Sequence, residues 1–503
     1  MSKILSATIF AAGAFGFTLA APAAQIGANF AGASFEDVIT LPPDTMGAVG
    51  PDHFVQFING GFIPFNKDGS LTGAEVDDET FWANAGFDPG SGNLSDPRIL
   101  YDPGSTRWFA IQVTTENTDN RVMLARSDTS DPTGTWKEVN FIGNSGGTAR
   151  FADFPTLGVD ANGVYIAANM FDSVAGNNFK SASIFSIPKA DLVQANPSLS
   201  GMKRFEGLSA SVSTTDVQTL QPVVNFSANP AHASVLLVGP PTAPNNYATL
   251  SKLTLTATSG TNPTLSGPTS IAVTAFNDPS LARQPDGTQT IASNDARFSS
   301  YVSQVGDTIW AVHNVNVNGH PALRWYKIDD TTNIILQSGT VSDPAGHFDY
   351  FFPSITANAN GDVVIAFNRS GDSTTGDEGR ISAYALIGTT SGVTTAFNEL
   401  LLLKQGEVSD YHLEQDLADN GFVVGFDGTE RWGDYSTITV DPSNPNGFWT
   451  VQEIPIPGGE IAGLVGANTE WSTQITEILV PEPASVSVLL ICGALATRRC
   501  RRT

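Results

Sequence analysis

The stretch from Asp434 to Glu453 reads DYSTITVDPSNPNGFWTVQE. A run rich in β-branched residues comes first, and a second apolar run begins at Phe448. Between them stands a segment of Pro, Ser, Asn and Gly, which are the residues that favour turns. Short β-branched and aromatic runs separated by turn residues are typical of antiparallel strands. The stretch therefore predicts a β-hairpin with an acidic residue at each of its two free ends.

The same unit recurs along the chain. Six copies are clear, each a first run joined to a second: Asp44–Gly50 with Phe54–Asn59, Asp96–Asp102 with Arg107–Gln112, Asp153–Asp160 with Val164–Asn169, Arg297–Val302 with Ile309–Asn314, Phe352–Asn358 with Val363–Asn368, and Asp434–Asp441 with Phe448–Glu453. A weaker seventh copy joins Leu220–Asn225 to Ser234–Gly239. The copies start about 50 to 80 residues apart, which leaves room for four strands in each repeat.

These repeats predict an all-β protein, a β-propeller. Long stretches with helical periodicity are absent from the sequence, and repeated four-stranded sheets closed into a ring protect the strand edges that an open sheet exposes. We expect seven blades, with six or eight as alternatives. Trp471–Ile478 should be a last strand that completes a blade begun near the N-terminus. Trp108, Trp310 and Trp449 hold equivalent positions in their strands and should pack between blades.

Polar residues end the second strands of the clear repeats: Asn59, Gln112, Asn169, Asn314, Asn368 and Glu453. Carboxylates stand near the start of the first strands: Asp44, Asp96, Asp153, Asp295, Asp349 and Asp434. A hairpin returns the end of its second strand to the start of its first, so both sets should meet at one end of the ring. Four arginines occur nearby in sequence: Arg98, Arg297, Arg369 and Arg431.

Two interpretations of this polar rim remain open. Carboxylate and amide oxygens suit a hard cation such as calcium, and arginines among them suit sugar hydroxyls or uronate carboxylates. Alternatively, the same side chains bind backbone groups of adjoining turns and blades. No residue is assigned a catalytic role, and the metal, if there is one, is not identified by the sequence.

The two ends of the chain carry export signals. Lys3 precedes the apolar run Ile4–Leu19, and Ala21-Pro22-Ala23 has the small residues of a cleavage site, so residues 1–23 are predicted to be a signal peptide. Val480, Pro481, Glu482 and Pro483 open the other end. Next comes an apolar segment, residues 484–497, which we expect to form a short membrane helix. The basic residues Arg498, Arg499, Arg501 and Arg502 follow, leaving 24–479 as the propeller domain.

The Val480-Pro481-Glu482-Pro483 motif, the apolar segment and the arginine cluster occur in the order found in the PEP-CTERM sorting tail. Residues 480–503 therefore resemble such a tail. That resemblance implies processing by an exosortase, after a signal peptidase has removed the leader. It also implies export across the inner membrane to the cell surface, the outer membrane or the outside of the cell. The repeats resemble sialidase-like propellers, and Ser127–Trp136 is similar to an Asp-box turn with altered spacing. Arg98 is followed by Ile99 and Leu100, which departs from the Arg-Ile-Pro motif of sialidases and weakens any implied activity.

The net charge of −25 narrows the choice of partners. Removal of both ends takes away Lys3, four arginines and Glu482, so the domain keeps 20 basic and 49 acidic residues. Nucleic acid and anionic membrane surfaces are disfavoured by that excess. Both cysteines, Cys492 and Cys500, lie in the tail, so the domain has no disulfide. The sequence favours an exported propeller that binds polysaccharide without catalysis. The alternatives are a glycoside hydrolase or lyase and a purely structural matrix protein.

Overall fold

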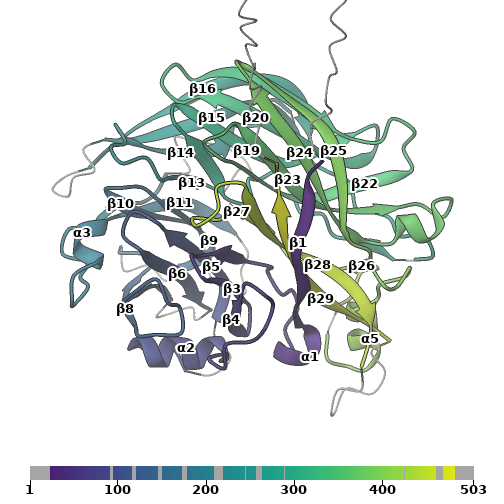
Figure 1. Cartoon of the computed structure of the whole chain (residues 1–503), viewed down its shortest axis with the longest axis horizontal. Helices are drawn as coiled ribbons and strands as arrows, with labels where there is room; N and C mark the ends of the chain where they lie inside the picture. The colour runs from purple at the N-terminus through teal and green to yellow at the C-terminus, as the bar shows by residue number, and fades with distance from the viewer. Residues whose placement is uncertain are drawn as a thin grey trace, which may run out of the picture.

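The protein is a seven-bladed β-propeller, as predicted from the repeats. The computed structural model describes residues 23–90, 94–115, 120–145, 150–172, 178–208, 219–243, 245–256, 263–287, 289–423, 425–459 and 468–481. Figure 1 shows the sheets following one another around the molecule in chain order. The predicted signal peptide up to residue 22 and the tail from Glu482 onward, with Pro483 and the arginines, lie outside the described residues.

Each blade is an antiparallel sheet, numbered here in chain order with the strand nearest the axis first. Blade 1 contains β2 (Gly47–Val49), β3 (His53–Ile58) and β4 (Gly61–Asn66). Blade 2 contains β5 (Leu94–Asp102), β6 (Arg107–Thr114), β7 (Arg121–Ser127) and β8 (Trp136–Ile142). Blade 3 contains β9 (Phe151–Val159), β10 (Gly163–Phe171), β11 (Phe179–Pro188) and β12 (Lys203–Phe205).

Blades 4 and 5 form one continuous sheet, because their innermost strands β13 and β18 pair in parallel. Blade 4 contains β13 (Gln221–Asn225), β14 (Ala233–Val238), β15 (Asn246–Thr256) and β16 (Thr264–Asn277). Blade 5 contains β18 (Val302–Val305), β19 (Thr308–Val317), β20 (His320–Asp329) and β21 (Ile334–Val341). Blade 6 contains β22 (Phe348–Ala357), β23 (Asp362–Gly371), β24 (Ser382–Ser391) and β25 (Thr394–Lys404).

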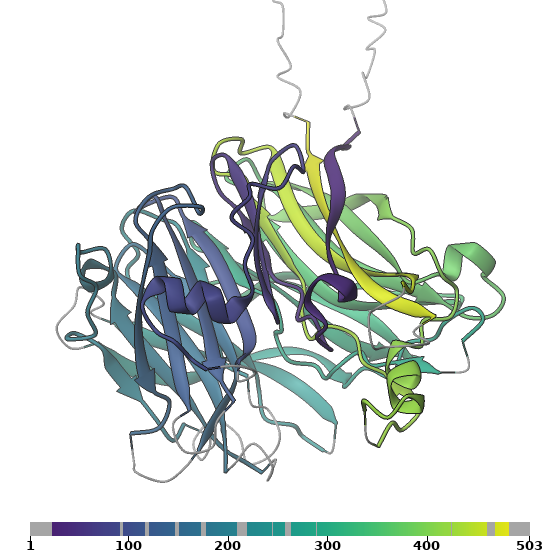
Figure 2. The ribbon, with the colours of Figure 1, turned by 90° about the horizontal axis from the view of Figure 1, so that it is seen from below.

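Blade 7 closes the ring with strands from both ends of the chain. It contains β27 (Thr437–Val440), β28 (Gly447–Pro457), β29 (Thr469–Leu479) and β1 (Gln25–Ser34). The predicted last strand is thus the third of its blade, and the N-terminal strand is the fourth. Gln25 pairs with Leu479, so the two ends of the domain lie side by side, as Figure 2 shows for the purple β1 and the yellow β29.

Short helices and one minor sheet lie in the connections. The helices are α1 (Phe35–Val38), α2 (Asp78–Ala85), α3 (Lys189–Leu192), η1 (Gly376–Gly379) and α5 (Leu413–Asp419), and β17 (Thr290–Ile291) pairs with β26 (Thr429–Glu430). Within the described part of the chain, no helix is both long and apolar enough to cross a membrane.

Aromatic side chains fill the spaces between blades. Trp108, Trp310 and Trp449 are at most 3% exposed, which confirms their predicted packing role. Trp449 of blade 7 stacks on Phe54 of blade 1, with ring centroids 5.8 Å apart. Ring contacts of this kind add to the free energy of apolar burial, so they help hold neighbouring blades together.

A bulge interrupts the innermost strand of three blades at the same point. The pairing of β5 with β6, of β9 with β10 and of β22 with β23 slips across Asp96-Pro97, Phe154-Pro155 and Phe352-Pro353 respectively. The residue before each proline has a left-handed backbone, with φ of 59°, 50° and 46°. Proline lacks the N–H that a central strand needs, so the chain leaves the ladder there. Each bulge lies near the start of its strand, at the rim.

Candidate binding site at the rim of the propeller

Side chains from five parts of the ring meet at the rim where the innermost strands begin. We define the rim site as Asp44, Asp96, Asp153, Asp434, Arg297 and Arg431. Asp44 and Asp434 precede β2 and β27, Asp96 and Asp153 belong to β5 and β9, and Arg297 lies just before β18. The polar and charged residues that the sequence placed at one end of the ring therefore do meet there in blades 7, 1, 2 and 3.

Hydrogen bonds link these blades in sequence. The Asp434 amide donates to Asp44 Oδ1 at 3.1 Å, and Asn59 Nδ2 donates to Asp44 Oδ2 at 2.9 Å. The Asp96 amide donates to Asn59 Oδ1 at 3.0 Å, and the Phe154 amide donates to Asp96 Oδ2 at 2.8 Å. The two buried aspartates and the half-buried Asn59 thus bind backbone amides of neighbouring blades, which fixes the four blades relative to one another.

Burial and mutual repulsion raise the pKa of two of the carboxyl groups. Burial raises the pKa of Asp44 well above its usual value, and the charges of Asp434 and Asp96 raise it further. Burial also raises the pKa of Asp153 to about 7, again with help from Asp96 and against the opposing charge of Arg297. Burial thus favours the protonated form of both groups, and at neutral pH Asp153 is close to its titration midpoint.

The outer layer of the rim site is accessible, whereas the inner layer is not. The side chains of Asp434 and Arg431 are 17% and 41% exposed and form an ion pair at 3.1 Å. Arg297 is 19% exposed and binds Asp295 in a bidentate manner, through Nε at 2.8 Å and Nη2 at 2.7 Å. Asp44 and Asp96, at 1% and 5% exposure, lie beneath them. A ligand would therefore contact Asp153, Asp434, Arg297 and Arg431.

Below the rim site, the Arg98 side chain lies across the centre of the propeller. Its side chain is completely buried, its Nε donates to Pro155 O at 3.0 Å, and its Nη1 donates to Ser299 O at 2.8 Å. The guanidinium carbon lies 3.4 Å from the centroid of the Tyr435 ring. The Tyr435 and Tyr301 hydroxyls donate to Pro97 O and Ile99 O, at 3.1 and 2.8 Å. Arg98 thus binds the backbone rather than facing the solvent at the mouth.

The remaining amide and carboxyl residues of the predicted rim hold connections between segments. Gln112 Nε2 donates to Asp78, Asn169 Nδ2 to Thr219, Asn314 Nδ2 to Ser293 O and Asn368 Nδ2 to Glu453 O, while Glu453 accepts from the Gly433 amide. All five are at most 4% exposed. For these residues the structure favours the second interpretation given above, in which the polar column joins turns and blades.

In blade 6, the predicted rim residues Arg369 and Asp349 bind other partners. Arg369 stacks on the rings of Phe348 and Tyr384, at 4.1 and 4.2 Å from their centroids, and its Nη2 donates to the Tyr384 hydroxyl. Asp349 accepts three hydrogen bonds from Arg283, from the backbone amide and Nη2 at 2.8 Å and from Nε at 2.9 Å. Among the described residues, no group of three or more His, Cys, Asp or Glu side chains is placed to hold a metal ion.

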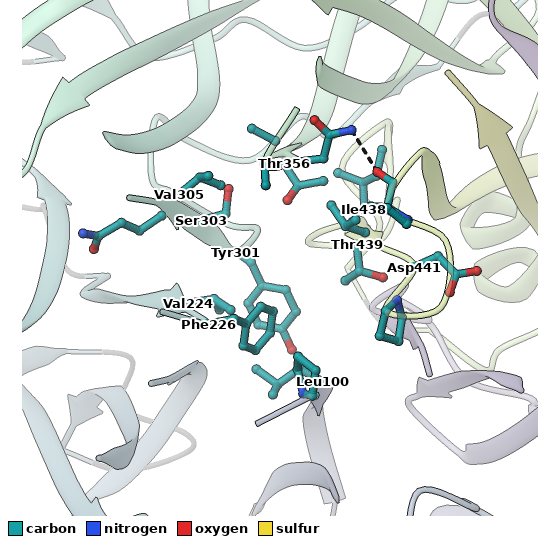
Figure 3. A pocket seen from close by; sticks show the side chains of 18 of the residues that line it. Leu100, Val224, Phe226, Tyr301, Ser303, Val305, Thr356, Ile438, Thr439 and Asp441 are labelled. Carbon is teal, nitrogen blue, oxygen red and sulfur yellow. Dashed lines mark hydrogen bonds between the residues drawn. The ribbon is translucent and has the colours of Figure 1, made fainter. Parts of the chain in front are cut away.

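A cavity of about 490 Å³ lies at the other end of the axis, where the innermost strands end. Figure 3 shows Leu100, Val224, Phe226, Tyr301 and Ile438 around it, together with Ser303, Thr356, Thr439 and Asp441. Tyr301 lines this cavity, and its hydroxyl donates to Ile99 O. Arg98, Tyr301 and Tyr435 together are called the Arg98 layer, which lies between the cavity and the rim site. No site was predicted from the sequence at this second mouth.

No protein-family model and no curated protein matches the chain. Several solved structures are similar in part. A protein of unknown function from Dyadobacter fermentans DSM 18053 has a TM-score of 0.36 and 11% identity over 77% of this chain and 95% of its own. An N10 neuraminidase-like protein of A/little yellow-shouldered bat/Guatemala/060/2010 has a TM-score of 0.37 and 8% identity, over 73% of this chain and all of its own.

An α-L-arabinanase of Penicillium chrysogenum, complexed with arabinobiose, has a TM-score of 0.32 and 11% identity over 77% of this chain and 94% of its own. Likenesses this distant carry no argument about activity. The propeller assignment rests on the sheets of the protein itself.

Proposed function

We propose that this protein is an exported propeller that binds polysaccharide at the rim site without catalysis. The observation that carries the proposal is the convergence of four carboxyl groups and two arginines from different parts of the ring, with one layer accessible and one layer fixed beneath it. A few fixed polar groups that converge from several elements are a feature of ligand sites. Paired guanidinium and carboxyl groups offer adjacent donors and acceptors to the hydroxyls of a sugar ring.

The charge balance of the rim site favours a neutral sugar over a uronate. Arg297 and Arg431 each already have a carboxylate partner, Asp295 and Asp434. Burial lowers the pKa of Arg297, but the charges of Asp295, Asp434 and Asp153 raise it on balance, so the cation is held by carboxylates at the site. A uronate would compete with these carboxylates for the same guanidinium groups. Neutral hydroxyls would instead bond to the exposed edges of the pairs.

A panel of neutral and uronate-containing polysaccharides tests the proposal, with affinity measured by titration calorimetry. We expect a neutral member of the panel to bind, and Asp434→Asn to weaken binding about tenfold, the loss expected for one hydrogen bond to a charged group. Asp377→Asn is the matched control, because the Asp377 side chain is 77% exposed on blade 6. If no member binds, or if both variants bind like the parent, the purely structural matrix role replaces this proposal.

A second candidate, a glycoside hydrolase or lyase, is favoured by the titration of Asp153. A carboxyl group with a pKa of about 7 beside the carboxylate of Asp96 is the arrangement that acid–base catalysis uses. Turnover of any polysaccharide in the panel, abolished by Asp153→Asn while binding persists, would establish this candidate. Binding without turnover favours the non-catalytic proposal.

Export and sorting form the other half of the proposal. The pairing of Gln25 with Leu479 supports it, because the two ends of the propeller domain, which adjoin the predicted signal peptide and the predicted tail in sequence, lie side by side. Mass spectrometry of the mature protein from its native producer tests it. We expect an N-terminus close to Ala24 and a C-terminus within residues 480–483. A mature chain that retains residues 484–503 would contradict processing by an exosortase.

A further inference from the structure

We propose that the cavity at the second mouth binds the protein's own C-terminal apolar segment, residues 484–497. This inference is independent of sugar binding, because the Arg98 layer separates the cavity from the rim site. It rests on three observations: the lining of the cavity, the place where the described chain ends, and the chemistry of the sequence that follows.

The lining suits apolar side chains. Leu100, Val224, Ile355 and Ile438 come from four different innermost strands, and Phe226 follows one of them. Phe226 is 50% exposed, which is unusual for an aromatic residue of this size. An apolar cavity of about 150 Å³ is sufficient to bind benzene in another protein. The volume here, about 490 Å³, therefore has room for several apolar side chains at once.

The described chain ends beside this cavity. The Val480 amide donates to Asn446 O at 2.9 Å, and the preceding residue Pro445 lines the cavity. Val480 is 6% exposed and packs in the same apolar cluster as Ile438, which is a wall residue. Figure 2 shows the end of β29 at one end of the molecule together with the start of β1. From Pro481, three extended residues span about 10 Å, so residue 484 is within reach of the opening.

The following sequence has the complementary chemistry. Residues 484–497 read ASVSVLLICGALAT and contain no charged side chain. Before any processing, this segment must be covered by a membrane, by another protein or by the domain itself, since exposed apolar surface of this size is unfavourable in water. The cavity offers an apolar site within the same chain, where the effective concentration of the segment is high.

The two native cysteines provide the test, because both lie in the tail. In full-length protein with Cys500→Ser, Cys492 is the only thiol. Ser303→Cys adds a second thiol in the cavity wall, where the Ser303 hydroxyl has no partner among the described residues. Ser373→Cys is the matched control, placed in the exposed loop after β23 at the rim. Each protein is treated with a short bismaleimide, and the cross-linked peptides are identified by mass spectrometry.

We expect a cross-link within one chain between Cys492 and position 303, at least tenfold more abundant than that between Cys492 and position 373. Ala359→Trp, at an exposed position of the lining, should lower the yield several-fold without disturbing the core. Equal yields at the two positions, or none at position 303 in protein with an unchanged melting temperature, would overturn the proposal. Cross-links only between two chains would overturn it as well, and would assign the cavity to the tail of a second copy.

Discussion

The same innermost strands build two different mouths at the two ends of the axis. β5 begins near Asp96 and ends near Leu100, and the segment that leads through β27 passes from Asp434 to Ile438 within five residues. One mouth is therefore charged and is crossed by hydrogen bonds between blades, whereas the other is apolar and encloses a cavity. Both mouths are lined by the same innermost strands, so the position of a residue along its strand decides whether it lies at the charged mouth or at the apolar one.

Backbone strain separates the two mouths as well. Asp44, Asp96, Phe154 and Phe352 have left-handed backbones, and all four lie at or near the starts of innermost strands. Such conformations cost about 1–3 kcal/mol each in a non-glycine residue, and they persist where the surroundings impose them. Two of the four, Asp44 and Asp96, belong to the rim site, which agrees with a functional role for that mouth.

The largest expected effect comes from the layer that separates the mouths. Arg98→Met should lower the free energy of unfolding by about 3–5 kcal/mol, because it leaves two buried carbonyl groups, Pro155 O and Ser299 O, without their donor. Urea denaturation followed by tryptophan fluorescence measures the loss. Arg380→Met is the control, since Arg380 is 29% exposed in a surface ion pair, and its loss should be below about 1 kcal/mol. Equal losses would mean that the Arg98 layer does not hold the axis.

A smaller effect is expected at the two tyrosines that flank Arg98. Tyr301→Phe and Tyr435→Phe each remove a hydroxyl that donates to a buried backbone carbonyl, Ile99 O or Pro97 O. Each should cost about 1–3 kcal/mol, the penalty for an acceptor left unsatisfied. Tyr301 lines the cavity and Tyr435 does not, so only Tyr301→Phe should alter the yield of the cross-link to Cys492. A change in both variants would show that the two mouths are coupled.

The pH dependence of stability should come chiefly from buried carboxyl groups away from the cavity. Asp153 has a pKa of about 7 in the folded protein against 3.8 unfolded, so the folded state holds a proton between those values and loses stability as pH rises through that window. Burial raises the pKa of Glu470 to about 7 and that of Glu430 to about 8, which extends the decline to about pH 8.

Asp153→Asn should flatten this decline by on the order of 1 kcal/mol between pH 4 and 7, because the partly exposed group is screened by solvent. Melting temperatures from pH 4 to 9 measure the slope, with Asp377→Asn as the control that should leave it unchanged. An unchanged slope in Asp153→Asn would mean that Asp153 titrates near its ordinary value.

Much of the ring could be predicted from the sequence, because the same hairpin unit recurs along the chain at similar spacing. The weak seventh unit at Leu220–Asn225 is a true innermost strand, β13, and the contact between Asn59 and Asp44 follows from hairpin geometry alone. Whether each of these side chains is buried or accessible to solvent could not be predicted in this way. Arg98 follows a bulge, and a bulge shifts every later side chain on its strand to the other face.

The bulges themselves have a signal in the sequence. Asp96-Pro97, Phe154-Pro155 and Phe352-Pro353 place a proline at the same point of three repeats. A proline repeated inside a central strand indicates a break in the ladder. The cavity had no comparable signal, since Leu100, Val224 and Ile438 are ordinary apolar strand residues until the ring brings them around one axis.

The smallest effect is expected at the only ion pair that the described residues place in the cavity lining. Lys67 binds Asp441 at 2.7 Å, with the lysine 24% exposed and the aspartate 3% exposed. Asp441 also accepts from the Ser443 amide at 2.8 Å, so it keeps a partner when the lysine is removed. Lys67→Met should therefore cost at most about 1 kcal/mol. A double-mutant cycle with Asp441→Asn isolates the coupling between the two side chains. A coupling of about 3 kcal/mol or more would show that charge stabilises this mouth as strongly as the rim, and the contrast between the mouths would then lie in their shape alone.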